Sequence, residues 1–136
     1  MVTYVLDSSA VLRYLHDKAG SDRVAEIIKG RLAGDCEALI SAAHWGEVAG
    51  ITCKLYGRRE MEQVLSRLSA LGLQVVSMDG ELAVQAALIK LQRAIPYVDA
   101  FGIALTALAP DRIFVTSDFD FKSASRDVKI EFLPAL

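Results

Sequence analysis

Cysteines are few in this sequence and long uncharged apolar runs are missing, and both features exclude classes of protein. Cys36 and Cys53 are too few for a disulfide framework and lack the spacing of metal ligands, so we interpret them as buried thiols. Every long apolar stretch is interrupted by a charge or a proline before about 18 residues, which excludes a membrane-spanning helix. The first residues also lack the basic and long apolar segments of a signal peptide. We therefore expect a cytoplasmic protein without a membrane partner.

A strong excess of charge of either sign is missing as well. The chain has 15 Lys and Arg against 17 Asp and Glu, which gives a net charge of −2 at pH 7. This balance provides no general attraction to nucleic acid and argues against a nonspecific DNA coat protein. It remains compatible with an enzyme that holds phosphate through metal ions and a few local basic side chains.

Apolar residues, by contrast, are abundant. They make up 53% of the 136 residues, enough to bury a real core, and no linker or repeat divides the chain. Ser8 or Ser9, Ser41 and Asp79 are suitable helix N-caps. Strand-like segments alternate with helical ones and lie at residues 2–6, 38–40, 73–77, 112–116 and 128–132. The alternation predicts one α/β domain over residues 1–136, a three-layer α/β/α sandwich with a central, mostly parallel sheet.

Four acidic residues stand alone in apolar segments: Asp7, Glu47, Asp99 and Asp118. Asp7 and Asp118 each follow a predicted strand directly, at the edge where open parallel sheets bind their ligands. A single isolated carboxylate can be explained as a helix cap. Four carboxylates at one edge would repel one another and take up protons, unless a cation lay among them.

A divalent metal ion is the cation that this pattern favours. Oxygen ligands suit Mg²⁺ or Mn²⁺, whereas Zn²⁺ would call for cysteines or clustered histidines. Such an ion polarises a phosphoryl oxygen and activates a bound water. From the residues alone, the sequence therefore predicts an acidic metal site in an α/β domain, suited to the hydrolysis of phosphodiester bonds.

Four segments in order along the chain resemble the PIN-domain nucleases, particularly the VapC-type toxins of VapBC toxin–antitoxin pairs. They are residues 5–10 (VLDSSA), 41–47 with the helix that ends at 56–58, 95–101 (IPYVDAF) and 115–121 (VTSDFDF). The resemblance implies Mg²⁺- or Mn²⁺-dependent endoribonuclease activity, a hydrolase reaction on an RNA substrate. It also implies a homodimer and a cognate antitoxin whose tail enters the acidic groove.

Carried over residue by residue, the resemblance makes Asp7 and Asp99 the principal metal ligands. Glu47 and Asp118 would complete a catalytic quartet, directly or through water. We expect the attacking group to be a metal-activated water, because the sequence offers no Ser/His/Asp or Cys/His arrangement for a protein nucleophile.

Residues beside the quartet have weaker predicted roles. Ser8 and Thr116 would support the site through their hydroxyl groups, and Asp120 is either a further supporting acid or a solvated turn residue. His44 stands three residues before the glutamate, where these proteins often have asparagine. A lone histidine beside Trp45 is more typical of a packed residue than of a metal ligand.

Three basic residues are predicted to bind RNA phosphate: Lys90 and Arg93 near the end of one helix, and Arg58 after Tyr56-Gly57. Basic side chains at helix ends are also ordinary partners of the helix dipole, so this interpretation has a structural alternative.

Other functions on a similar α/β framework remain as alternatives. A phosphoacceptor receiver domain would need an acidic pair at the first strand, and a dehalogenase-type phosphatase a second aspartate at position 9. Ser8 and Ser9 disfavour both. An RNA-processing nuclease outside a toxin–antitoxin pair and an inactive PIN-fold binding module stay open.

Overall fold

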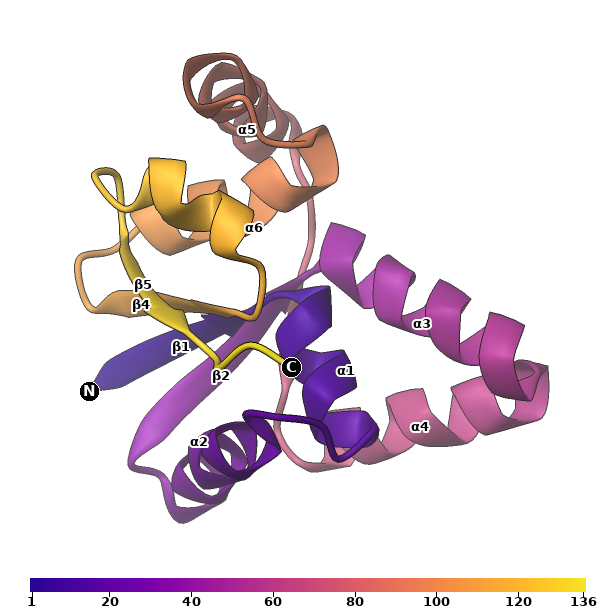
Figure 1. The fold of residues 1–136 in the computed structure, drawn as a ribbon. Helices are drawn as coiled ribbons and strands as arrows, with labels where there is room; N and C mark the ends of the chain where they lie inside the picture. Colours follow the sequence, from indigo (N-terminus) through magenta and orange to yellow (C-terminus); the bar gives the residue numbers. More distant parts are fainter.

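The computed structural model describes all of residues 1–136 and is built around a five-stranded sheet (Figure 1). The order of the strands is β3-β2-β1-β4-β5, and every neighbouring pair is parallel. The strands are β1 (Val2–Leu6), β2 (Cys36–Ser41), β3 (Gln74–Val76), β4 (Arg112–Thr116) and β5 (Lys129–Phe132). The expected α/β domain is thereby confirmed, with a sheet that is wholly parallel.

Helices cover both faces of this sheet and complete a three-layer sandwich (Figure 1). The helices of one layer are α1 (Ser8–Leu15), α2 (Ser21–Ala33), α3 (Ala42–Tyr56) and α4 (Arg58–Ala70). The other layer contains α5 (Gly80–Arg93), α6 (Tyr97–Ala107) and the short 3-10 helix η1 (Phe119–Ala124). No helix has the length and apolar character that crossing a membrane would require.

Alternating side chains of the strands divide the core in two. In β1, Leu6 packs with the layer of α1 to α4, whereas its neighbour Val5 packs with the layer of α5 and α6. Val115 and Phe114 of β4 divide in the same way. This alternation follows from the two-residue period of a strand, and burial on both faces explains why the central strands β1 and β4 are largely apolar.

Element ends agree well with the local signals in the sequence. Ser41 accepts a hydrogen bond from His44 N–H at the start of α3, and Asp79 accepts one from Leu82 N–H at the start of α5. Gly34, with φ of 81°, ends α2 in the left-handed conformation that glycine adopts without strain. The residues predicted to cap α1 differ from those observed, and the reason lies in the site itself.

The sheet reverses its direction of growth between β1 and β4. From β1 the chain first adds β2 and β3 on one side, and later adds β4 and β5 on the other. The loops that follow β1 and β4 therefore lead away from each other at the carboxyl ends of these strands. Open α/β sheets form their ligand-binding crevice at this position. Leu6 pairs with Val115 at this point, so Asp7, the residue after β1, lies beside Thr116, the last residue of β4.

Candidate active site

Asp7 directly follows β1 at this edge of the sheet and is almost completely buried. Its side chain accepts hydrogen bonds from Ser9 Oγ (2.7 Å) and Ala10 N–H (2.9 Å) at Oδ1, and from Thr116 Oγ1 (2.6 Å) at Oδ2. The bond from Ala10 N–H makes Asp7 the N-cap of α1. The prediction that Ser8 or Ser9 caps this helix is wrong, because the helix begins at once after the strand and the preceding residue supplies the capping oxygen.

Burial sets the electrostatics of Asp7. Only 2% of the residue is exposed, and this loss of solvent raises the pKa of its carboxyl above the ordinary value. The nearby His44 and the hydrogen bonds from neighbouring groups lower the pKa, but they offset the burial only in part. In the metal-free protein, an ionised Asp7 is therefore a destabilising charge that lacks a full counterpart.

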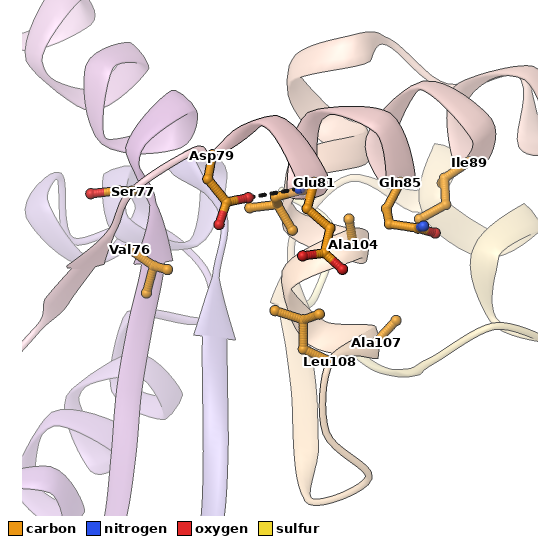
Figure 2. Close-up of a pocket in the computed structure, with 10 residues that line it drawn as sticks. Val76, Ser77, Asp79, Glu81, Gln85, Ile89, Ala104, Ala107 and Leu108 are labelled. Atoms are coloured by element: carbon orange, nitrogen blue, oxygen red, sulfur yellow. Dashed lines mark hydrogen bonds between the residues drawn. The ribbon is translucent and has the colours of Figure 1, made fainter.

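Helix capping alone does not require such burial, as a second aspartate of the chain demonstrates. Asp79 caps α5 through a bond of 2.8 Å from Leu82 N–H, with nearly the same backbone angles as Asp7. Its side chain is exposed at the rim of a pocket of about 400 Å³ between β3, α5 and α6 (Figure 2). None of the four isolated acids lines that pocket. The burial of Asp7 thus points to a role other than capping.

His44, Glu47 and Asp99 form a second group beside Asp7. His44 Nε2 lies 3.3 Å from Asp99 Oδ1 and 3.9 Å from Glu47 Oε1. One ligand atom from each of these residues lies within 4.8 Å of the other two. Helix α3 supplies His44 and Glu47 three residues apart, hence on one face, and the first turn of α6 supplies Asp99.

A glycine on α6 allows this close approach of the two helices. A Cβ at Gly102 would lie 2.5 Å from Phe114 Cε1 and 2.9 Å from His44 Cε1. His44 is fully buried and its ring sits against Phe114, so it is the packed residue that the sequence suggested. It also contacts two predicted metal ligands, Glu47 and Asp99, through the ring nitrogen Nε2. Gly102, three residues after Asp99 and the one glycine of α6, was the signal of a close neighbour.

The two groups are joined through the start of α1. Ser8 Oγ donates to Glu47 Oε1 at 2.9 Å, while its neighbour Ser9 donates to Asp7. Three of the four isolated acids are thus connected within one polar cluster at the carboxyl edge of the sheet. Both hydroxyl groups suggested as helix caps donate to carboxylates instead, and for Ser8 this contact is of the kind expected of a supporting residue.

Asp118 lies at the rim of this cluster. Its backbone N–H donates to Thr116 Oγ1 (3.0 Å), and its Oδ1 accepts from Asp120 N–H (2.9 Å) at the start of η1. Asp118 is not part of the ligand group around His44, and Asp120 is exposed. The role of Thr116 is clearer, because its hydroxyl connects Asp7 to the loop that carries Asp118.

Two of the three predicted RNA-binding side chains are engaged with acids. Arg93 donates twice to Asp127, at 2.6 and 2.8 Å, and holds the pKa of that carboxyl below its usual value. Arg58 pairs with Glu62 at 3.2 Å on the exposed surface of α4. Lys90 is exposed on α5.

The donor set fits a divalent cation. Carboxylate oxygens of Glu47 and Asp99 lie within reach of a common ion, and Asp7 adds a buried carboxylate nearby. A bound cation would also supply the positive charge that offsets the burial of Asp7. These features are what a metal site requires and what a purely structural cluster would avoid.

Asp7→Asn is expected to raise the melting temperature of the metal-free protein at pH 7 by several degrees. Because the pKa of Asp7 is raised on folding, its ionisation destabilises the folded state; this penalty is absent below the unfolded pKa, near 3.8, and grows as pH rises through the folded pKa. The amide can donate to Thr116 Oγ1, whose own proton can turn to Ser9 Oγ at 3.4 Å.

Thermal melts of both proteins in EDTA, from about pH 4 to about pH 8, measure this difference. The two melting temperatures should converge towards the acid end. A variant that is less stable than the wild type at pH 7 would show that the buried charge does not destabilise the fold.

Known proteins with the same architecture were found by comparison. The family model described as PIN domain matches residues 4–127. The crystal structure of VapBC2 from Rickettsia felis bound to promoter DNA has a TM-score of 0.72 at 15% identity, over 98% of this chain and 100% of that chain. Mycobacterium tuberculosis VapC20, a sarcin–ricin loop cleaving toxin, has a TM-score of 0.71 at 17% identity, over 96% and 99% of the two chains.

Identities this low establish a common fold and no more. Comparison with curated protein sequences finds no significant match. The family match, however, runs from within β1 to beyond η1, leaves out only β5 among the strands, and includes both groups of site residues. This protein therefore belongs to the PIN domain family.

Proposed function

We propose that this protein is a metal-dependent endoribonuclease that hydrolyses RNA phosphodiester bonds at the crevice between β1 and β4. One observation carries the proposal: Glu47 and Asp99, far apart in the sequence, meet at the buried ring of His44, and the buried carboxyl of Asp7 lies close enough to that ring for its pKa to be lowered by it. Without a cation, this cluster would repel a phosphate group. Family membership supports the same conclusion.

Mg²⁺ or Mn²⁺ is the proposed cofactor, held by Asp7, Asp99 and Glu47, with Asp118 at the rim. When bound, such an ion stabilises charge on the phosphoryl group and activates water for the attack. The protein positions the carboxylates for this task. Ser9 donates a hydrogen bond to one oxygen of Asp7 and Thr116 donates one to the other.

Glu47 differs from the other acids of the cluster in its exposure. Its side chain is 41% exposed, against 23% for Asp99, and Ser8 fixes its Oε1. A partly solvated carboxylate can accept a proton and release it to bulk water, whereas a buried one exchanges slowly. We therefore assign proton transfer to Glu47 in addition to its part in holding the ion, and charge binding alone to Asp7 and Asp99.

The biological setting that we propose is a toxin–antitoxin pair, with this chain as the toxin and a homodimer as its free form. The Rickettsia felis neighbour and a Salmonella typhimurium neighbour are VapBC complexes. An antitoxin tail that enters the crevice would need a basic side chain to complement the acids. Of the three predicted basic residues, we propose Lys90 as the one that binds RNA phosphate, because Arg93 and Arg58 already form ion pairs with acids.

Asp99→Asn is expected to lower metal-dependent RNA cleavage by about a hundredfold or more, because the variant loses an anionic ligand and keeps the shape of the side chain. Cleavage of a labelled RNA by purified protein, with millimolar Mg²⁺ or Mn²⁺ and with EDTA, measures the effect. Equal cleavage in EDTA, or by the folded variant, contradicts the proposal.

A further inference from the structure

Among the groups at the crevice, His44 stands out as a nitrogen donor in a set of oxygen donors. Its side chain is completely buried, and its Nε2 faces Asp99 Oδ1 at 3.3 Å and Glu47 Oε1 at 3.9 Å. On the other side of the ring, Nδ1 lies 3.4 Å from Ser41 Oγ. No other residue of this cluster brings a ring nitrogen to the carboxylates.

The distances fit shared ligation of an ion better than a strong hydrogen bond. A charged N–H···O bond between imidazolium and carboxylate is usually about 2.7–2.9 Å long, shorter than the separation from Asp99. Neighbouring ligands that each lie about 2.1 Å from one ion are roughly 3 Å apart. His44 Nε2 has such a separation from one carboxylate and a slightly longer one from the other.

Ser41 provides the partner that a ligating imidazole needs. Histidine ligands commonly donate their second ring N–H to a neighbouring oxygen, which fixes the tautomer. Ser41 Oγ, at 3.4 Å from Nδ1, is available to accept that proton. Nε2 then directs a lone pair at two carboxylate groups, and this arrangement is unfavourable unless a cation lies between them.

The surrounding side chains hold the ring in this orientation. Phe114 packs against it, and α6 approaches so closely that a side chain at Gly102 would collide with both rings. A ring fixed in this way cannot turn away from the acids when a metal binds. Preorganisation of this kind is typical of a ligand and favours one geometry of coordination.

We propose that His44 Nε2 is a ligand of the metal ion held by Glu47 and Asp99, and that this nitrogen makes the site prefer transition-metal dications such as Mn²⁺ over Mg²⁺. The inference rests on the metal site of the proposed function and adds its selectivity. Imidazole binds borderline transition metals well, whereas Mg²⁺ strongly prefers oxygen ligands. Asparagine at this position would leave only oxygen donors.

Electron spin echo spectroscopy of Mn²⁺ bound to the protein tests the ligation without an activity assay. The chain contains only two histidines, so His16→Asn leaves His44 as the single source of an imidazole nitrogen. We expect ¹⁴N modulation in this variant, and its replacement by a ¹⁵N pattern when histidine is isotope-labelled. Bound Mn²⁺ without any histidine nitrogen coupling would overturn the inference, whereas the metal-dependent nuclease proposal would stand.

Calorimetric titration with Mn²⁺ and with Mg²⁺ tests the selectivity. In His44→Asn, the ratio of the Mg²⁺ to the Mn²⁺ dissociation constant should fall by about tenfold or more, because only the Mn²⁺ affinity depends strongly on the nitrogen. His16→Asn is the matched control and should keep the wild-type ratio. An unchanged ratio in folded His44→Asn would overturn the inference. Failure of folded wild type to bind either ion would overturn the metal site itself.

Discussion

Asp7→Asn is expected to reduce RNA cleavage by roughly a thousandfold or more while the protein stays folded. The carboxylate is the most deeply buried acid of the site, and Thr116, Ser9 and the first turn of α1 fix both of its oxygens. Asparagine keeps the size of the side chain and the cap on α1, but it removes the anionic ligand. Activity and stability should therefore change in opposite directions in the metal-free protein.

Asp79→Asn is the matched control for this variant. It makes the same change at an N-cap of nearly identical backbone geometry, on α5 and outside the crevice. Its cleavage rate should equal that of the wild type. If folded Asp7→Asn cleaved RNA at the wild-type rate as well, Asp7 could not be a metal ligand in the reaction.

A rise in the melting temperature on addition of divalent metal is the second large effect that we expect. A ligand that binds only the folded state at a hundred times its dissociation constant stabilises that state by about 2.7 kcal/mol. For a domain of this length, this corresponds to roughly 8–12 °C. The gain should grow as pH rises, because protons compete with the cation for Asp7 and burial raises the pKa of its carboxyl.

The same melts with Asp7→Asn isolate the contribution of the buried carboxylate. The variant starts from a higher melting temperature in EDTA and should gain much less from Mn²⁺ or Mg²⁺. Wild-type protein whose melting temperature is unchanged in millimolar metal would argue against a preformed metal site.

A buried acid that destabilises the metal-free fold is understandable as part of a binding site. The hydrophobic core on both faces of the sheet provides stability that the crevice partly opposes. Functional sites commonly hold groups in environments that the fold alone would not favour. Asp7 and the exposed cap Asp79 show the contrast within one chain.

Much of the fold could be predicted because its signals are local. The apolar runs of β1 and β4, the cap at Ser41 and the left-handed turn at Gly34 are each decided by a few neighbouring residues. Once the alternation of strands and helices implied a parallel sheet, the position of Asp7 at its carboxyl edge followed. Isolation of an acid in an apolar segment indicated burial at Asp7 alone, because Glu47, Asp99 and Asp118 are partly exposed.

The rest depends on contacts between distant parts of the chain. His44 meets Asp99 across 55 positions, through the packing of α3 against α6 and the missing side chain at Gly102. Arg93 meets Asp127 across 34 positions, and so it lies paired rather than free for RNA. Local patterns contain little information on either contact, since both depend on how complete helices are placed.

Convergence of the acids around one cation is the claim on which the whole account depends. A crystal of the protein soaked in Mn²⁺, measured with anomalous scattering, tests it directly. We expect an anomalous peak bounded by Asp7, Glu47 and Asp99 at the carboxyl edge of β1. A soaked crystal that still diffracts well but shows no anomalous peak beside these three residues would contradict the account.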